Sequence, residues 1–276
     1  MKRQTMHLIR QSALLKNFKY ARYTPLLYLK DKKKYATMLA AQRNMGGFMK
    51  GILVKRLESS FYAFRKTLGR FVESYEKFIE MYKTGKIYIS KKVNVYDLLD
   101  DGNTEKMMYL IEQQDVMEFE TKEFSSQFIR DLQYDLSQLK SMQLIWSLID
   151  TDPKLEEFKR GLTTSPLFKE KKAIVFTEST ETAQYLYEEL KEIYGDRLIY
   201  FSGQSSSSLK IEIEDSFNPK FKDKKNDKYD LLITTDVLAE GINLHRANVL
   251  VNYDLPWNPT RIMQRVGRIN RVGTEY

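Results

Sequence analysis

Short apolar segments that alternate with helical patterns are the feature that most constrains the fold of this chain. Four runs of mainly aliphatic and aromatic residues are expected to be strands: 173–176, 198–201, 231–234 and 249–251. Helices are expected between them, from Thr180 to Tyr194 with Gly195 as the C-terminal cap, and from the serine-rich loop at 202–208 to Phe217. Strands and helices that alternate at this spacing require right-handed crossovers and a parallel sheet. The sequence therefore predicts an α/β fold, a parallel sheet flanked by helices.

The part of the chain before this pattern is predicted to be mainly helical. From Met1 to about Met81 the apolar residues recur at helical spacing. Gly46-Gly47 is expected to interrupt these helices and Thr24-Pro25 to cap one of them. Two further helices are expected, at 128–149 and after Asp152-Pro153, where Asp152 would cap the helix. The remaining segments are expected to be short strands at 86–89 and 93–96, and a mobile, acidic insertion at 97–125. These patterns divide the chain into a basic helical segment (1–70), a helical insertion or protrusion (71–165) and the α/β domain (166–276).

Charge is distributed unevenly along the 276 residues, whose formal net charge is +8. Residues 1–70 contain 17 Lys and Arg but only two acidic residues, whereas the remaining 206 residues contain 28 basic and 35 acidic ones. Such a block is typical of a surface that binds a polyanion, although a merely solubilising cationic surface has the same composition. Four tyrosines in the block could stack on nucleic-acid bases or belong to the core: Tyr20, Tyr23, Tyr28 and Tyr35.

Several classes of protein are disfavoured by composition. The chain has no cysteine, which excludes disulfides and thiolate metal sites and fits a reducing compartment. Two histidines that are far apart, His7 and His245, do not suggest a metal site. No window reaches the roughly 20 apolar residues of a membrane span, so we expect a soluble, cytoplasmic protein without a membrane partner.

Two arginines near the end of the α/β pattern are the first candidates for chemistry. Arg268 and Arg271 are three residues apart, so on a helix they share one face, and guanidinium groups match phosphate oxygens. Gly267 precedes them and leaves room for the close approach of another surface. An isolated pair of this spacing is commonly only a solvated helix face. Polar residues near the ends of the last two strands favour a functional site instead, because open α/β sheets bind ligands at the carboxyl ends of their strands.

The order of these motifs resembles motifs V and VI of superfamily 2 helicases. The resemblance rests on Thr234-Thr235-Asp236, on Glu240-Gly241-Ile242-Asn243-Leu244, on Trp257-Asn258-Pro259 and on the Gln264–Gly273 motif Q-x-x-G-R-x-x-R-x-G. The Trp-Asn-Pro and Gly-Ile-Asn-Leu elements resemble the bacterial Swi/Snf-type branch, as does the segment 54–68. The resemblance implies that residues 166–276 form the second RecA-like lobe of a motor, with the helices of 70–165 as a protrusion on it.

The resemblance also implies roles for particular residues. Arg268 and Arg271 would be arginine fingers that stabilise charge on the γ-phosphate, and Gln264 would join the polar network between the lobes. Residues that would line the ATP cleft are Glu240, Gly241, Asn243 and Gly267. Residues at strand ends that would bind nucleic-acid phosphates, or serve only as ordinary turn residues, are Thr177, Gly203, Thr234 and Thr235. Asp236 is expected to organise its loop rather than to bind a metal.

The sequence contains only half of an ATP site. No G-x-x-x-x-G-K-[ST] phosphate loop and no Asp-Glu-x-His or Asp-Glu-Ala-Asp box is present. ATP and Mg²⁺ would therefore be held mainly by an N-terminal, ATP-binding lobe that lies outside this sequence, and double-stranded DNA would be the nucleic-acid partner. The chain reaches only three residues beyond motif VI, so we expect the parent protein to continue further.

Two other readings of the sequence stay open. The chain could be a non-catalytic nucleic-acid-binding or scaffolding protein that keeps the helicase fold, with the basic block carrying its function. It could also belong to an unwinding helicase of the restriction-enzyme type, although the Trp-Asn-Pro element favours translocation without strand separation. An upstream lobe with an intact phosphate loop, encoded in the parent gene, would decide between the motor and the non-catalytic scaffold.

The first prediction concerns turnover. The purified chain alone should not hydrolyse ATP measurably, because it lacks both the phosphate loop and the acidic metal-binding box. The check is a phosphate-release assay with and without DNA, and DNA-stimulated turnover by a preparation free of other ATPases would refute the half-site interpretation.

The second prediction concerns the basic block. The chain should bind DNA weakly, and log K should fall linearly as log salt rises, because phosphate neutralisation releases condensed counterions. Fluorescence anisotropy over a salt series measures this slope. Equal affinity at low and moderate ionic strength would contradict a polyanion role for residues 1–70.

Overall fold

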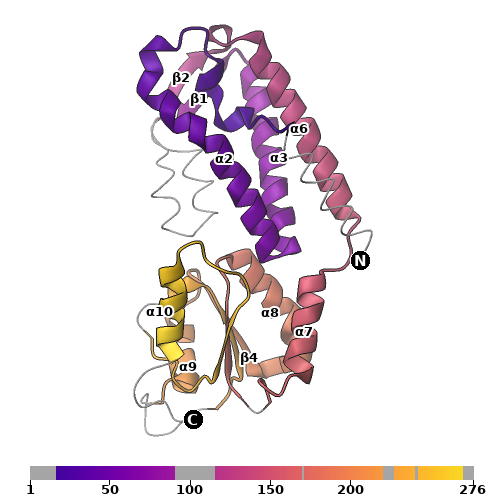
Figure 1. Ribbon diagram of the computed structural model, residues 1–276, viewed down its shortest axis with the longest axis vertical. Helices are drawn as coiled ribbons and strands as arrows, with labels where there is room; N and C mark the ends of the chain where they lie inside the picture. Colours follow the sequence, from indigo (N-terminus) through magenta and orange to yellow (C-terminus); the bar gives the residue numbers. More distant parts are fainter. Residues whose placement is uncertain (1–16, 91–115, 170, 220–226, 240–241, 270–276) are drawn as a thin grey trace. The chain divides into compact units, whose positions relative to one another are not determined.

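The computed structural model describes residues 17–90, 116–169, 171–219, 227–239 and 242–269 (Figure 1). It divides into two compact units: unit 1 comprises residues 1–57 and 64–150, and unit 2 comprises residues 58–63 and 151–276. The division that the sequence suggested at residue 70 falls inside a helix of unit 1, and the one at residue 165 follows a helix of unit 2.

Unit 2 is built on a four-stranded sheet with the order β4-β5-β3-β6. All neighbouring strands are parallel, as the alternation of strands and helices predicts. The strands are β3 (Ala173–Phe176), β4 (Leu198–Phe201), β5 (Leu231–Thr234) and β6 (Val249–Asn252). Phe176 lies opposite both Thr234 and Asn252, and Phe201 lies opposite Thr234, so all four strands end at the same edge. This register brings the residues that follow each strand together.

Helices cover both faces of the sheet (Figure 1). The helices of unit 2 are α7 (Pro153–Thr164), α8 (Thr180–Tyr194), α9 (Ser207–Phe217) and α10 (Pro259–Ile269). Side chains alternate along β3: Ile174 and Phe176 join the core that contains Phe217 of α9, whereas Val175 joins the core that contains Leu186 of α8. Both sides of β3 are fully buried, which explains the continuous apolar runs that identified the strands.

Capping residues begin and end the helices of unit 2 where the sequence indicates. Asp152 accepts hydrogen bonds from the backbone N–H groups of Lys154 and Leu155 at the start of α7, and Ser179 accepts one from Thr182 N at the start of α8. Gly195 ends α8 with a φ of 52°, in the left-handed region that an L side chain rarely adopts. The predicted helix starts and stops are therefore confirmed here.

Unit 1 combines three long helices with a two-stranded hairpin (Figure 1). The helices are α2 (Ala36–Ser59), α3 (Phe61–Lys83) and α6 (Ser126–Ser147), and the antiparallel strands are β1 (Lys86–Ser90) and β2 (Val116–Glu120). Six short 3-10 helices complete the described elements of the chain: η1 (Ala21–Tyr23), η2 (Pro25–Tyr28), η3 (Lys33–Tyr35), η4 (Thr121–Glu123), η5 (Gly195–Arg197) and η6 (Asp236–Ala239). No described helix of either unit is long and apolar enough to span a membrane.

Two sequence expectations about unit 1 are wrong. Gly46 and Gly47 do not interrupt a helix but lie inside α2, and a Cβ on Gly46 would come within 3.5 Å of the Tyr20 side chain, so the small residue suits close packing. Residues 116–124 belong to the core rather than to a mobile insertion, because Phe119 and Phe124 are buried. Thr24 and Pro25 do begin a helix, the short η2, although Thr24 makes no side-chain hydrogen bond to it. The strand expected at 93–96 and the helix expected before residue 17 lie outside the described residues.

The tyrosines of the basic block lie in or against the core of unit 1. Tyr20 and Tyr23 are buried, and the ring of Tyr28 stacks on Phe128 with 4.9 Å between ring centroids. The ring of Tyr35 contacts Phe119. These contacts favour the core alternative over stacking on nucleic-acid bases.

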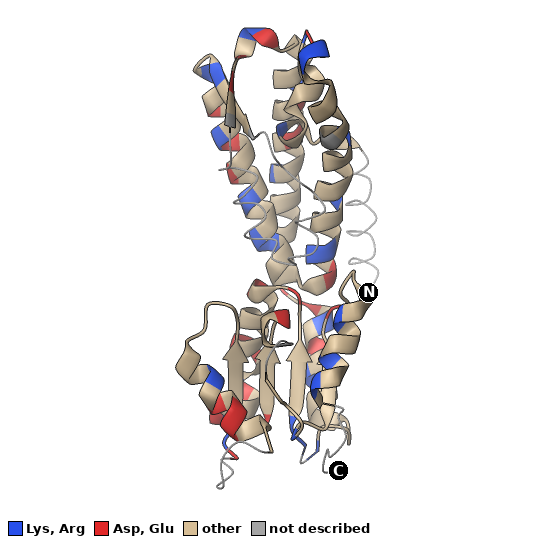
Figure 2. Cartoon of the chain, turned by 90° about the vertical axis from the view of Figure 1, so that its left-hand side faces the viewer, with Lys and Arg blue, Asp and Glu red and all other residues tan. Residues whose placement is uncertain are grey.

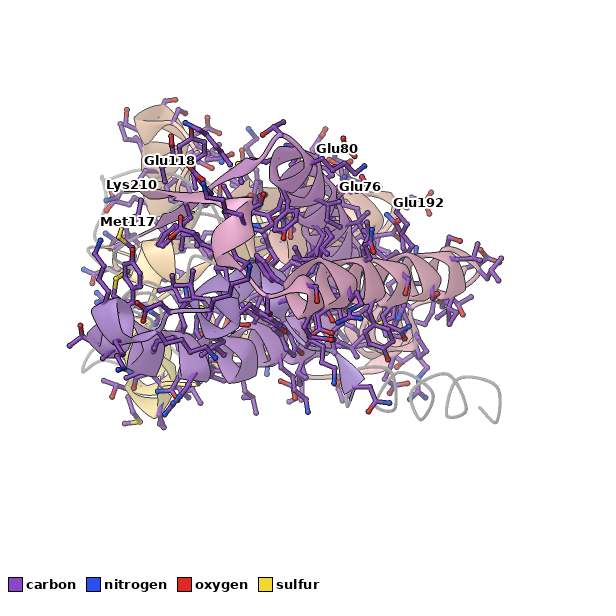
Figure 3. All side chains as sticks on the ribbon, turned by 90° about the horizontal axis from the view of Figure 1, so that it is seen from above. Glu76, Glu80, Met117, Glu118, Glu192 and Lys210 are labelled. Carbon is purple, nitrogen blue, oxygen red and sulfur yellow. The ribbon has the colours of Figure 1, made fainter. Side chains whose placement is uncertain are left out.

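Ion pairs on the outside of unit 1 lie in solvent (Figure 3). Glu76 pairs with Lys140 at 2.6 Å, Glu80 pairs with Lys83 at 2.7 Å, and Glu118 pairs with Lys86 at 2.6 Å. All of these side chains are at least 44% exposed, so each pair contributes little to stability.

One buried carboxylate connects the start of unit 1 to two of its helices. Asp135 on α6 is fully buried and accepts hydrogen bonds from Lys19 N at 2.7 Å, from Ala21 N at 2.9 Å and from the Tyr75 hydroxyl at 2.9 Å. Burial raises the pKa of the Asp135 carboxyl to about 6, although the three donors act in the opposite direction. Because this pKa lies above its unfolded value, the contribution of Asp135 to stability is largest below about pH 4 and is lost as pH rises through about 6.

Asp135→Ala should destabilise unit 1 by about 2–4 kcal/mol, because two backbone N–H groups and one hydroxyl lose their buried acceptor. The measurement is urea unfolding followed by the fluorescence of Trp146, which is buried in unit 1, in a Trp257→Phe background. Glu73→Ala, which removes an exposed carboxylate from α3, is the control and should change stability by less than about 0.5 kcal/mol. An Asp135→Ala variant as stable as the control would show that the hydrogen bonds to Asp135 do not stabilise unit 1.

Candidate functional site

The candidate site lies at the edge of unit 2 where the four parallel strands end. The first residues beyond the strands are Thr177 after β3, Ser202 after β4, Thr235 after β5 and Tyr253 after β6. Helix α10 begins at Pro259 and carries the motif Q-x-x-G-R-x-x-R as far as Ile269. Polar groups gathered at this edge are positioned as ligand-binding groups in open α/β sheets.

Arg265 is the most buried charged side chain at this edge. It is 0% exposed, and its guanidinium forms a fork with Asp236: Nε lies 2.6 Å from Oδ1 and Nη2 lies 2.9 Å from Oδ2. Its Nη1 donates to Asn252 Oδ1 at 2.8 Å and, more weakly, to the Asp254 carbonyl oxygen at 3.4 Å. The planar guanidinium matches a carboxylate in this bidentate geometry. Arg265 therefore fixes α10 against the ends of β5 and β6.

Sequence reasoning singled out Arg268 and Arg271 and missed Arg265. The signal was present, because Arg261, Arg265 and Arg268 are four and three residues apart and share one face of a helix. Arg261 is the second arginine that contacts Asp236, at 3.4 Å, and it also lies 3.7 Å from Glu178. The expectation that Asp236 organises its loop agrees with these contacts, since its carboxylate accepts hydrogen bonds from both arginines.

Arg268 differs from its two neighbours on the helix. It lies half-buried in the last turn of α10, and its Nε is buried without a hydrogen-bond partner among the described residues. An unsatisfied buried donor is costly, and one on a cation is available to an anionic partner. A Cβ on Gly267 would meet nothing within 4 Å, so the surface beside Arg268 is open. Gln264 is exposed one turn earlier.

The threonines at the strand ends are turned inward. Thr177 is fully buried, and its hydroxyl donates to Asp254 Oδ2 at 2.5 Å. Thr234 is also fully buried and donates to the carbonyl oxygen of Thr235 at 3.2 Å. The hydroxyl of Thr235 is buried without a partner among the described residues. Gly203 is exposed after β4, where a Cβ would lie 3.6 Å from the side chain of Val237.

Only some of the expected site residues belong to the described part of the chain. Asn243 is half-buried in the loop before β6, and the neighbouring Leu244 N donates to the Arg268 carbonyl oxygen at 3.2 Å, so this loop reaches the end of α10. Three of the expected residues lie outside the described part of the chain: Glu240, Gly241 and Arg271. Within the described residues no group of three or more His, Asp or Glu side chains could hold a metal ion.

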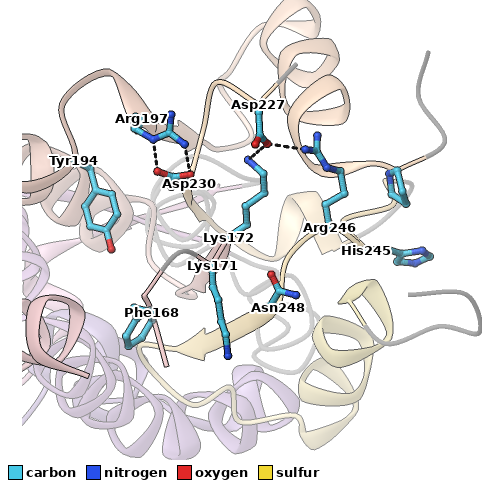
Figure 4. Close-up of a pocket in the computed structure, with 11 residues that line it drawn as sticks. Phe168, Lys171, Lys172, Tyr194, Arg197, Asp227, Asp230, His245, Arg246 and Asn248 are labelled. Carbon is cyan, nitrogen blue, oxygen red and sulfur yellow. Dashed lines mark hydrogen bonds and ion pairs between the residues drawn. The ribbon is translucent and has the colours of Figure 1, made fainter. Parts of the chain in front are cut away.

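A second hollow, of about 550 Å³, lies at the opposite edge of the sheet, where the strands begin (Figure 4). Five of its charged side chains pair with one another: Asp227 pairs with Lys172 at 2.9 Å and with Arg246 at 2.6 Å, and Arg197 forms a fork with Asp230. Burial lowers the pKa of the Lys172 ammonium, and Asp227 opposes this shift. This hollow is therefore braced by ion pairs among its own lining residues.

Comparison with known proteins agrees with this geometry. Residues 154–273 match the model of the helicase conserved C-terminal domain. The four-stranded parallel sheet flanked by helices in this part of the chain has the α/β fold expected of a RecA-like helicase lobe.

Three curated relatives are similar to part of the chain. The ATP-dependent helicase YqhH of Bacillus subtilis is 37% identical over 130 residues, covering 46% of this chain and 22% of YqhH. The ATP-dependent RNA helicase rok1 of Neurospora crassa is 36% identical over 103 residues, covering 37% of this chain and 13% of rok1. The RNA polymerase-associated protein RapA of Erwinia tasmaniensis is 31% identical over 122 residues, covering 44% of this chain and 12% of RapA. The chain thus spans less than a quarter of the length of these relatives.

The geometry of α10 separates a structural arginine from one with free hydrogen-bonding capacity. Arg265→Ala should destabilise unit 2 by about 3–5 kcal/mol, because the Asp236 carboxylate loses its buried partner. Arg268→Ala should cost less than about 1 kcal/mol, since the Nε of Arg268 makes no hydrogen bond that could be lost. Amide hydrogen exchange at β3 and β5 measures both variants, and equal losses of protection would contradict this assignment.

Proposed function

We propose that this chain supplies the second motor lobe of an ATP-dependent helicase or translocase of the Swi/Snf type that acts on double-stranded DNA. The observation that carries the proposal is Arg268, a half-buried cation with an unsatisfied Nε, on a helix that the buried fork between Arg265 and Asp236 holds in place. A rigidly mounted arginine with spare donors is suited to stabilising charge on a transferring phosphoryl group.

The residues present fit one side of an ATP site and not the whole of it. Arg268 and Arg271 would hold the γ-phosphate, and Gln264, Gly267, Asn243, Glu240 and Gly241 would line the same side. When bound, ATP with Mg²⁺ supplies the transferable phosphoryl group. The contribution of this chain is to hold guanidinium groups where negative charge develops, with little reorganisation at the moment of reaction. The sequence lacks the phosphate loop and acidic box, so an N-terminal lobe is required to bind the nucleotide.

Each unit would contribute nucleic-acid contacts of its own, unit 2 from its strand ends and unit 1 from its basic part. Thr177 and Thr234 are fully buried, so they would offer backbone N–H groups rather than hydroxyls, whereas Gly203 is exposed and Thr235 has a spare hydroxyl. Residues 32–57 contain seven Lys and Arg and no acidic residue, and exposed members of this set lie on η3 and α2 (Figure 2). These cations would contact the phosphate backbone without reading the sequence.

DNA is proposed because Trp257-Asn258-Pro259 and Gly241-Ile242-Asn243-Leu244 resemble Swi/Snf-type motors. The relative rok1 is named as an RNA helicase, so RNA is the competing substrate. Titration of the assembled two-lobe motor with matched DNA and RNA duplexes distinguishes them. Stimulation of turnover by RNA alone would overturn the DNA assignment and leave the motor assignment intact.

In the assembled motor, Arg268→Ala or Arg271→Ala should lower the turnover of ATP by about 10³-fold or more, the scale of an arginine finger. Nucleotide binding should suffer much less, because the other lobe holds the phosphates and the fingers act mainly on the transition state. Lysine at either position should rescue poorly, since an ammonium cannot reproduce the fork.

The control for this experiment follows from the structure. Arg246 is a poor control, because its side chain is only 16% exposed and pairs with Asp227. Arg160 on α7 is 67% exposed, and its loss should leave turnover unchanged. Near-normal turnover of folded Arg268→Ala and Arg271→Ala variants would refute the finger assignment and favour a non-catalytic scaffold.

A further inference from the structure

The junction between α2 and α3 lies in the α/β unit although both helices belong to the helical one. Residues 58–63 are part of unit 2, whereas the rest of α2 and α3 is part of unit 1. Ser59 ends α2 and Ser60 precedes α3, and both side chains are buried. These two buried hydroxyls, at the break between α2 and α3, require hydrogen-bond partners.

Several contacts within unit 2 fix the backbone of this junction. The Lys154 ammonium donates to the carbonyl oxygens of Glu58 at 2.6 Å and Ser59 at 2.9 Å, which are unpaired at the end of a helix. Asp152 Oδ2 accepts from Phe61 N at 3.3 Å, so the residue that caps α7 also caps α3. The Tyr62 ring stacks on Tyr185 of α8 at 5.1 Å, with only 4° between the planes.

The Ser59 side chain reaches the residue at which the loop to α10 begins. Its hydroxyl lies 2.5 Å from Asp254 Oδ2, across 195 positions in the sequence. The same carboxylate accepts from the Thr177 hydroxyl at 2.5 Å and from Glu178 N at 2.8 Å. Asp254 is 6% exposed, so these donors replace solvent around its charge. Removing Ser59 Oγ leaves a buried carboxylate oxygen with one donor fewer.

Asp254 in turn connects to the arginine helix. Its carbonyl oxygen faces Arg265 Nη1 at 3.4 Å, and Arg265 lies one helical turn before Arg268. Only Leu255–Asn258 separate Asp254 from α10, and Pro256 and Pro259 restrict the backbone of that connection. A displacement of Asp254 is therefore passed to the start of α10 rather than absorbed by a flexible loop.

We propose that Ser59 is a positioning residue for the arginine half-site: through Asp254 it links the α2–α3 junction to α10 and thereby sets where Arg268 lies. The proposal rests on the assignment of Arg268 as a finger. Its consequence is that the α2–α3 junction, which belongs to unit 2, is hydrogen-bonded through Ser59 to the carboxylate that precedes the arginine helix.

Ser60 provides a matched control for Ser59. It is the next residue, is 1% exposed and is equally hydrogen-bonded, to the Thr182 hydroxyl at 2.8 Å and from Ala63 N at 3.0 Å. None of the described hydrogen bonds of Ser60 involves Asp254. Ser59→Ala and Ser60→Ala therefore remove the same buried group from the same segment, and only the first loosens Asp254.

The experiment compares both variants in the assembled two-lobe motor. Ser59→Ala should lower kcat for ATP hydrolysis by about 10–100-fold, the scale for a small misplacement of a catalytic group, with the KM for ATP changed by less than about threefold. Ser60→Ala should keep kcat within about threefold of the wild type at a similar Tm. Equal kcat values for the two variants would overturn the proposal.

A double variant tests whether Ser59 acts through Arg268. If it does, Ser59→Ala with Arg268→Ala should be no slower than Arg268→Ala alone, because the two changes remove the same contribution. Independent, multiplying losses would overturn the proposal. If Arg268→Ala alone leaves turnover unchanged, the proposed motor function fails instead, so the two failures are distinguishable.

A second substitution guards against a folding defect. Ser59→Cys keeps the shape of the side chain and a weak donor, so it should fold and give a kcat between those of the wild type and Ser59→Ala. Folded Ser59→Cys and Ser59→Ala variants that both match Ser60→Ala would refute the positioning role.

Discussion

The buried fork between Arg265 and Asp236 is the interaction on which the candidate site depends. A guanidinium with no exposed surface is stable only when nearly all of its donors are used, and here Asp236, Asn252 and the Asp254 carbonyl oxygen use them. These three acceptors come from the ends of β5 and β6. Because the fork joins α10 to the ends of these two strands, the register of the sheet determines where α10 lies. Arg268 lies one turn later on the same helix, so the fork also fixes its backbone, while its Nε keeps an unsatisfied donor.

Neighbouring arginines on the same helix differ in their contacts. Arg261 and Arg265 both direct their charge to Asp236, whereas Arg268 directs its charge to no described carboxylate. Buried ion pairs contribute more to defining a unique geometry than to net stability, because desolvation offsets most of the attraction. Precision in the placement of a guanidinium is what a phosphoryl-transfer site requires.

Each unit contains a carboxylate that joins segments far apart in the sequence. Asp135 holds the backbone of Lys19 and Ala21 in unit 1, and Asp254 holds Ser59 and Thr177 in unit 2. In both cases a single side chain closes a loop of more than 70 residues by accepting several hydrogen bonds at once. Such multiply bonded carboxylates are effective because each donor would otherwise be buried without a partner.

The sequence by itself determined the strands and helices of unit 2 and the α/β class of its fold. Apolar runs such as Ala173–Phe176 identify strands because both of their faces are buried, and Asp152, Ser179 and Gly195 mark helix ends through local hydrogen bonds or backbone conformation. Unit 1 was less predictable: Gly46 lies inside a helix and Phe119 in the core, because packing against distant residues overrides local preference. Only the tertiary structure decided that Arg265 is buried in a fork with Asp236 whereas the Nε of Arg268 has no partner among the described residues, and that Ser59 meets Asp254 across 195 positions. The reason is that a hydrogen bond between distant segments depends on where the whole chain places two atoms, which no local pattern records.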